Sequence, residues 1–127
     1  MAAKCKSLLI IEDEPDIRSV LQQTLEFEGY EAFTAANGQE GLELLAKIPR
    51  PCLILLDMMM PIMSGWEFLE KYSSDDVLAT IPVVIVSAAG EKAKSSAAKD
   101  FIRKPVELDR LLQVVREYCT PAPKAAS

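Results

Sequence analysis

Polar side chains that can do chemistry follow four short apolar segments of the sequence. These side chains are Glu12, Asp13, Asp57, Ser87 and Lys104. Asp57 ends the apolar run 52–56, where a carboxylate is a poor structural choice, because burying an uncompensated charge costs several kcal/mol. We therefore expect Asp57 either to react or to bind a metal ion, with the other groups as its partners.

Three acids and one amine, if brought together, are suited to phosphoryl chemistry. Carboxylates that lie close together raise one another's pKa, and a Mg²⁺ ion held by a few carboxylates relieves this repulsion. A carboxylate such as Asp57 can also act as a nucleophile and form an acyl phosphate. Phosphoryl transfer needs mainly positioning and charge neutralisation, which Mg²⁺, Lys104 and the Ser87 hydroxyl can supply. No glycine-rich phosphate loop is present, so nucleotide binding is not indicated.

Each of these residues alone also has an ordinary structural explanation. Asp57 can be a surface acid at a strand end, and Glu12 and Asp13 can form a solvated turn before a helix. Ser87 can be a helix N-cap, and Lys104 can be a solvated lysine. Their joint occurrence at successive strand ends is what favours a functional site.

The order of predicted elements explains why these groups should meet. Continuous apolar runs predict strands at 7–11, 31–35, 52–56, 82–86 and 101–102, and helical patterns predict helices at 15–28, 39–47, 64–72, 91–99 and 108–119. Strand and helix alternate five times, which indicates an α/β fold: a doubly wound, five-stranded parallel sheet of (βα)5 type with helices on both faces. In such sheets, ligands bind outside the carboxyl ends of the strands.

Composition narrows the function further. The 127 residues fit one domain, expected over residues 5–119 and followed by a tail or linker at 120–127. The net charge of −5 argues against nucleic-acid binding, and no apolar run approaches the roughly 20 residues of a membrane span, so we expect a cytoplasmic protein. The three cysteines form no CxxC pair and histidine is absent, which argues against a zinc site. Cys52 and Cys119 are expected to be small buried hydrophobic residues.

Four motifs in this order carry a family resemblance. They are Ile10–Pro15, Leu55–Gly65, Val84–Ala88 and Phe101–Pro105. Together they make the chain, from residue 7 to residue 119, resemble the receiver domain of two-component response regulators. The resemblance implies a flavodoxin-like sheet with strand order 2-1-3-4-5.

The resemblance also implies roles for the site residues. Asp57 would accept a phosphoryl group from a sensor histidine kinase or a phosphotransfer protein, and Lys104 would contact that group. The site would bind Mg²⁺ as its cofactor. The implied metal ligands are Glu12, Asp13, Asp57 and the backbone carbonyl of Met59. Ser87 and Phe101 would form the switch that changes affinity for a downstream protein partner, so the domain would be a signalling module and not an enzyme.

One segment departs from the family pattern. Only 17 positions separate Ser87 from Lys104, fewer than the family usually has. The segment around 91–99 is rich in alanine and lysine and only weakly amphipathic. We therefore expect a shortened or irregular fourth helix.

Three other interpretations remain open at this stage. The chain can be a receiver excised from a larger hybrid kinase or multidomain regulator, since its Pro-Ala-rich end suits a linker. It can be an aspartate-nucleophile phosphatase, although Met59 stands where such enzymes carry a second acid. It can also be a receiver-like binding module that works without phosphate, against which the complete set of site residues argues.

Overall fold

A single parallel sheet organises the molecule. The computed structural model describes residues 5–88 and 97–121. The strands are β1 (Ser7–Ile11), β2 (Glu31–Ala35), β3 (Ile54–Leu56), β4 (Val83–Ser87) and β5 (Asp100–Arg103). All pairings are parallel and the order is β2-β1-β3-β4-β5. The predicted α/β fold and its strand order 2-1-3-4-5 are therefore confirmed.

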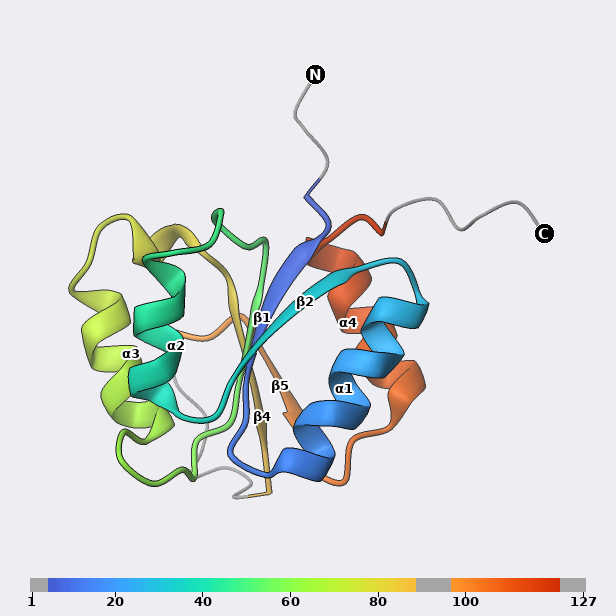
Figure 1. Cartoon of the computed structure of the whole chain (residues 1–127), viewed down its shortest axis with the longest axis horizontal. Helices are drawn as coiled ribbons and strands as arrows, with labels where there is room; N and C mark the ends of the chain where they lie inside the picture. The colour runs from blue at the N-terminus through green and yellow to red at the C-terminus, as the bar shows by residue number, and fades with distance from the viewer. Residues whose placement is uncertain (1–4, 89–96, 122–127) are drawn as a thin grey trace.

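Helices cover both faces of this sheet. In Figure 1, α1 (Pro15–Phe27) and α4 (Leu108–Tyr118) lie on one side of the sheet, and α2 (Gly38–Leu45) and α3 (Gly65–Ser73) lie on the other. A short 3-10 helix, η1 (Leu78–Thr80), precedes β4. The architecture is thus a three-layer α/β/α sandwich.

Alternating side chains of each central strand enter two different hydrophobic cores. Leu8 and Ile10 of β1 pack in the core that includes Leu21 of α1 and Leu111 of α4. Leu9 and Ile11 pack in the other core, which includes Phe68 of α3. Both faces of the strand are therefore buried, which is why its sequence is continuously apolar and not alternating.

Local signals fix where the helices begin and end. At the start of α3, the Ser64 side chain accepts a hydrogen bond from the Glu67 backbone N–H, and the Glu67 side chain accepts one from the Ser64 N–H, which forms a capping box. Asn37 caps α2 in a similar way through the Glu40 N–H. Gly29 follows α1 with a φ of 95°, a left-handed conformation that glycine adopts without a steric penalty.

The predictions for the fourth helix and for the cysteines have different outcomes. The expected shortened fourth helix falls largely on residues 89–96, which lie outside the described residues. The prediction that Cys52 is merely a small buried hydrophobic residue is wrong, because Cys52 forms a disulfide with Cys5. Cys5 lies two residues before β1 and Cys52 two residues before β3, and these strands are neighbours in the sheet, so the two side chains meet. Cys119 is free and buried, as predicted.

In the part of the chain that the structure describes, no helix has both the length and the apolar character needed to cross a membrane.

Candidate functional site

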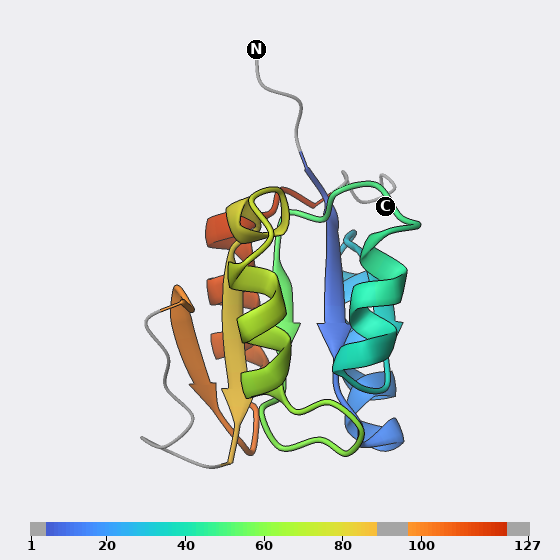
Figure 2. The same ribbon diagram turned by 90° about the vertical axis from the view of Figure 1, so that its left-hand side faces the viewer.

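The predicted site residues come together at the carboxyl-terminal edge of the sheet. The arrowheads of the strands end at this edge in Figure 2. Glu12 and Asp13 follow β1, and Asp57 follows β3 directly. The Asp57 N–H donates to the Ile11 carbonyl over 2.9 Å, so the pairing between the two strands continues up to the acid. Strand adjacency, and not proximity in sequence, therefore brings Asp57 to Glu12 and Asp13.

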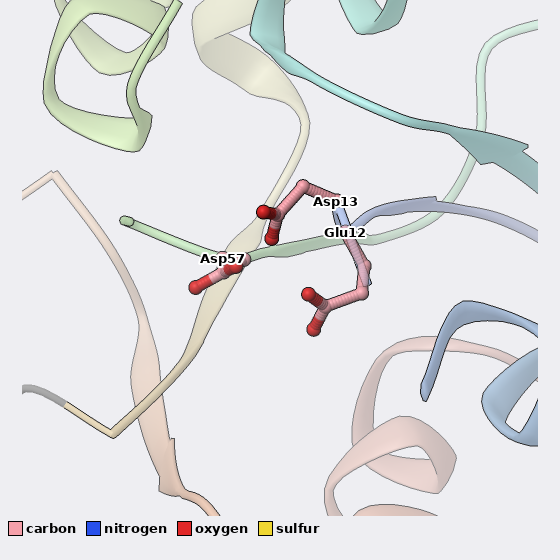
Figure 3. A group of neighbouring side chains, drawn as sticks. All are labelled: Glu12, Asp13 and Asp57. Atoms are coloured by element: carbon pink, nitrogen blue, oxygen red, sulfur yellow. The ribbon is translucent and has the colours of Figure 1, made fainter. Parts of the chain in front are cut away.

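The three acids form one cluster. Figure 3 shows the side chains of Glu12, Asp13 and Asp57 reaching into a common space from two chain segments. One carboxylate oxygen from each residue lies within 4.8 Å of the others. Glu12 and Asp57 are buried, whereas Asp13 is half-buried. This arrangement suits a hard divalent cation bound by oxygen ligands.

Lys104 supplies a positive charge to the same site. Its Nζ atom lies 2.7 Å from Glu12 Oε1 and 3.6 Å from Asp57 Oδ2. Burial disfavours the ammonium ion, but the neighbouring Glu12 and Asp57 carboxylates outweigh this effect and raise the pKa of Lys104. Lys104 is therefore a protonated lysine held between two acids.

The charges of the site are not balanced. Burial raises the pKa of Asp57 from 3.8 to about 7, and the negative charge of Glu12 adds to this shift, while Lys104 opposes it. Three carboxylates against one ammonium leave an excess of negative charge when all are ionised. A divalent cation among the three acids would remove that excess, so the residues present fit a Mg²⁺ ion.

Ser87 and Phe101 lie on the two strands next to the acid cluster. Ser87 is fully buried at the end of β4, and its carbonyl accepts a hydrogen bond from the Lys104 N–H over 3.0 Å. Phe101 of β5 is half-buried, stands opposite Ile85 in the sheet and packs against the core on the α3 side. The structure thus places both residues on strands whose carboxyl ends lie at the site.

Met59 lies in the loop that follows Asp57. Its backbone N–H donates to Asp57 Oδ1 over 3.3 Å, while its side chain is exposed. The backbone of this loop therefore contacts the Asp57 carboxylate directly.

Two further residues position the site, and the sequence did not single out either of them for this role. The Arg18 guanidinium of α1 donates to the Glu12 carbonyl over 2.8 Å and to the Asp13 carbonyl over 3.5 Å. Gly65 begins α3 against the backbone of the acid loop, where a Cβ atom would lie 2.6 Å from the Asp57 carbonyl oxygen. The position of Gly65 in the motif after Asp57 could have indicated its role in positioning the loop. A single arginine on a polar helix face gave no indication of the role of Arg18.

An apolar groove adjoins the site between α1 and the segment after β5. It has a volume of about 280 Å³. Its lining residues include Ile17, Val20 and Leu21 of α1, Lys104, Val106 and Leu108. Val20 and Leu108 are 51% and 42% exposed. Lys104 thus borders both the acid cluster and an accessible apolar surface.

Two curated relatives are similar to this chain over nearly their whole length. The sporulation initiation phosphotransferase F of Bacillus subtilis is 36% identical over 118 residues, covering 89% of this chain and 93% of the relative. The polar-differentiation response regulator DivK of Brucella anthropi is 33% identical over 118 residues, covering 89% and 95%.

Solved structures share the fold. The response regulator TrrA of Thermotoga maritima, in complex with Mg²⁺–BeF, gives a TM-score of 0.78 at 29% identity, covering 89% of this chain and 98% of that one. The chemotaxis protein CheY4 of Vibrio cholerae gives 0.81 at 27% identity, covering 90% and 98%. The model of the response regulator receiver domain matches residues 8–116. Since the match spans most of the chain, this protein belongs to the response regulator receiver domain family.

Proposed function

We propose that Asp57 is the phosphoacceptor of this receiver domain. The observation that carries the proposal is the buried Asp57 carboxylate, which lies 3.6 Å from the Lys104 ammonium within a cluster of three acids. A receiver domain takes part in two-component signalling. The donor would be a sensor histidine kinase or a phosphotransfer protein.

The acid cluster would hold the metal cofactor. Glu12, Asp13 and Asp57 would bind Mg²⁺, together with the backbone carbonyl of Met59. When bound, the ion neutralises charge on the phosphoryl oxygens. The relative TrrA was solved with Mg²⁺–BeF, which supports the choice of metal.

The chain's own groups would perform the transfer. A carboxylate oxygen of Asp57 attacks the phosphorus atom, a P–O bond forms, and the P–N bond to the donor histidine breaks. The histidine nitrogen keeps the electron pair. Lys104, held between Glu12 and Asp57, moves its ammonium onto a phosphoryl oxygen and holds the new charge. No general base is needed, because the Asp57 carboxylate attacks in its ionised form.

The signal would leave the site through β4 and β5. The phosphoryl group adds negative charge at Asp57, and the Ser87 hydroxyl would respond to it by bonding a phosphoryl oxygen. Phe101 on the neighbouring strand would follow this change, which shifts the population of conformers that a downstream protein partner binds. The domain would act by binding or by relaying phosphate, and no catalytic turnover on a separate substrate is proposed.

The donor protein would dock on the apolar groove beside Lys104. The groove is continuous with the site, so a donor helix seated there would bring its phosphorylated histidine to Asp57. The docking surface is apolar and the molecule is acidic, which favours a protein over a nucleic acid as the occupant. A cytoplasmic location suits such a partner, and residues 5–119 would form the receiver, with 120–127 as a tail or linker.

Treatment with acetyl phosphate and Mg²⁺ tests the chemistry. The intact mass should rise by one phosphoryl group, and the fluorescence of Trp66, which lies at the start of α3, should change at the same time. Neither signal should appear when EDTA is present from the start, because the acid cluster then carries no cation to offset its charge.

Matched variants locate the reaction. Asp57→Asn should abolish the mass gain. Asp13→Asn should weaken Mg²⁺ binding, so that the mass gain requires a higher Mg²⁺ concentration. Glu14→Gln is the control, since Glu14 is an exposed acid next to the cluster and should leave the reaction unchanged. Phosphoryl transfer that persists in Asp57→Asn would refute the assignment.

A further inference from the structure

The three cysteines gather at the amino-terminal edge of the sheet, opposite the acid cluster. Cys5 precedes β1, Cys52 precedes β3 and Cys119 follows α4. Their sulfur atoms surround one carbonyl oxygen, that of Ser7, at 4.0, 2.7 and 3.9 Å respectively. Three cysteines that are far apart in the sequence therefore form one cluster. This cluster has no role in the proposed phosphoacceptor function.

Two of the three cysteines are joined. Cys5 and Cys52 form a disulfide with a Cα–Cα distance of 5.8 Å, which is an ordinary separation for a bridged pair. The bond connects the chain ahead of two neighbouring strands and closes a loop over a sequence separation of 47. The parallel pairing of β1 and β3 fixes this proximity, so the fold presents the two thiols to each other even when they are reduced.

The sulfur atoms differ in access. Cys5 is half-buried, whereas Cys52 and Cys119 are 6% and 4% exposed. A dissolved thiol or disulfide would therefore reach Cys5 first. Burial raises the pKa of the Cys119 thiol to about 12, and because only the thiolate is nucleophilic, we expect Cys119 to exchange poorly with the bridge.

The bridge is connected to the end of α4 through the backbone. The Cys5 carbonyl accepts a hydrogen bond from the Thr120 N–H over 2.8 Å, and the neighbouring Lys6 carbonyl accepts one from Glu31 at the start of β2. The segment that the disulfide fastens thus holds both β2 and the chain that leaves α4. Breaking the bridge would loosen the anchor of the chain at residue 120.

We propose that Cys5 and Cys52 form a reversible thiol–disulfide site that responds to low-molecular-weight thiols and disulfides and controls how firmly the chain after α4 is anchored. The half-buried Cys5 leaves one side of the bridge accessible, and accessible bridges are more readily reduced than fully buried ones. In a reducing compartment, such as the one proposed for this receiver, disulfides are usually transient or redox-sensing. The site lies at the opposite edge of the sheet from the proposed phosphoryl chemistry.

The exchange balances without any further reactant. The Cys5 thiolate attacks one sulfur of a small disulfide, and the first small thiol leaves. The Cys52 thiolate then attacks the Cys5 sulfur of the mixed disulfide, and the second small thiol leaves. In total, two protein thiols and one small disulfide become one protein disulfide and two small thiols, and the two protein protons end on the released thiols. Reduction follows the reverse path.

A glutathione titration of the full chain tests the proposal. The protein is equilibrated in mixtures of reduced and oxidised glutathione, quenched in acid, denatured and alkylated, and the labels are counted by intact mass. All three cysteines should be labelled in excess reduced glutathione and only one in excess oxidised glutathione. Hydrogen exchange at the Thr120 amide should become about tenfold slower on oxidation.

Two variants make the result specific. Cys119→Ser should change from two labels to none across the same titration. Cys5→Ser, which alters the most accessible of the three positions, should keep two labels and a fast-exchanging Thr120 amide in every mixture.

Several results would overturn the proposal. They are three labels in every mixture, one label in every mixture, a lasting glutathione adduct on Cys5, or a bridge that includes Cys119. An unchanged Thr120 exchange rate would overturn the link to the chain after α4.

Discussion

The reactivity proposed for Asp57 depends on its neighbours and not on any property of aspartate itself. Burial and the Glu12 charge make its ionised form costly, and Lys104 offsets only part of that cost. In a metal-free domain, the carboxyl therefore titrates near neutral pH. A cation or a phosphoryl donor therefore binds at a group whose ionised form is energetically unfavourable in the metal-free fold. The stability of the fold is thus linked to the chemistry of the site.

The stability of the metal-free protein should depend on the protonation of Asp57. Because its pKa is about 7 in the folded chain and 3.8 ordinarily, folding favours the protonated form. That stabilisation is fully present below about pH 4 and is lost as the pH rises towards 7. In EDTA, Asp57→Asn should therefore unfold at nearly the same temperature as the wild type below about pH 4. At pH 8 it should be more stable by roughly 1–2 kcal/mol, after allowance for solvent screening.

Thermal unfolding followed by circular dichroism measures this difference. Asp76→Asn replaces an exposed aspartate elsewhere, and its effect should not vary with pH. If Asp57→Asn gave an equal shift at about pH 4 and at about pH 8, the carboxyl would not carry the charge imbalance.

Arg18 should matter for metal affinity although it does not touch the metal site directly. Its guanidinium holds the Glu12 and Asp13 carbonyls and so orients both acids. Residues that orient metal ligands typically contribute about 10- to 100-fold in affinity. Arg18→Ala should weaken Mg²⁺ binding by about tenfold, and Arg18→Lys should restore part of it, as measured by Mg²⁺ titration of Trp66 fluorescence.

Gln22→Ala is the matched control for Arg18. Gln22 also lies on α1 and donates a side-chain hydrogen bond to a backbone carbonyl, but to that of Ala32 on β2. This variant should lose stability without losing Mg²⁺ affinity. Equal affinity losses in both variants would mean that α1 acts only through its overall stability.

At the residue scale, the sequence predicts those groups whose types are costly where they stand. A carboxylate at the end of a buried strand needs charged or polar partners. Few such residues follow the other predicted strands, so Glu12, Asp13 and Lys104 could be predicted as the partners of Asp57. Arg18 did not follow, because a guanidinium that binds backbone carbonyls looks like any solvated arginine on a helix. The Cys5–Cys52 bond was missed because strand adjacency, and not sequence spacing, brings the two cysteines together.

At the scale of elements, α3 is held against the acid loop by a glycine. A Cβ atom on Gly65 would lie 2.6 Å from both the Asp57 carbonyl oxygen and the Met58 Cα atom. These are backbone atoms, so either the helix or the loop must move. Gly65→Ala should therefore destabilise the domain by roughly 1–3 kcal/mol and slow the labelling of Asp57 by acetyl phosphate.

Ser64→Ala separates these two effects. It removes the N-cap of the same helix, which costs about 1 kcal/mol, but adds nothing against the acid loop. Urea unfolding and the rate of phosphorylation should both change in Gly65→Ala, and only the former in Ser64→Ala. Normal phosphorylation of Gly65→Ala would show that the loop tolerates the displacement.

The exposed face of α1 should serve a protein donor and not a small one. The periodicity of α1 predicts Val20 on its apolar stripe, yet Val20 is 51% exposed on the groove beside Lys104. The apolar stripe of α1 is wider than the part of the helix that packs on the sheet, so part of the stripe remains accessible to a partner. Val20→Asp should slow phosphorylation by a protein donor by at least about tenfold and leave acetyl phosphate labelling unchanged.

Val77→Asp is the control for the groove. Val77 is 70% exposed and lies just before η1, so the same substitution adds the same charge away from the groove. A phosphotransferase domain carrying phosphohistidine serves as the donor in a gel-based transfer assay. If both variants slowed transfer equally, net charge and not the groove would explain the loss.

At the scale of the whole molecule, the parallel sheet separates two kinds of chemistry. The acid cluster follows the carboxyl ends of β1 and β3, and Cys5 and Cys52 precede the amino ends of the same two strands, which run in a common direction in Figure 2. The sequence predicts the acid cluster because charged residues are unfavourable beside buried apolar strands. It does not predict the disulfide, since cysteines are common in apolar surroundings. The expected fourth helix, on residues largely outside the described ones, stays a prediction.

The two edges should contribute independently to stability. Cys52 and Asp57 are five residues of extended chain apart, about 16 Å, and share no contact among the described residues. Mg²⁺ at 100 times its Kd should add about 2.7 kcal/mol, and the Cys5–Cys52 bridge roughly 2–4 kcal/mol. The increase in unfolding free energy caused by Mg²⁺ should then be the same in oxidised wild type and in Cys5→Ser, to within about 0.5 kcal/mol.

Urea unfolding of the two proteins, each with and without Mg²⁺, completes this cycle. A coupling larger than about 1 kcal/mol would contradict independence, because it would require β1 and β3 to transmit the state of the disulfide to the acids. In that case the redox state of the amino edge would tune Mg²⁺ affinity, and oxidised and reduced protein would be phosphorylated at different Mg²⁺ concentrations. Additivity would instead leave the two edges as separate inputs to one fold: one acts on β4 and β5 through Asp57, and the other acts on the chain after α4 through Cys5.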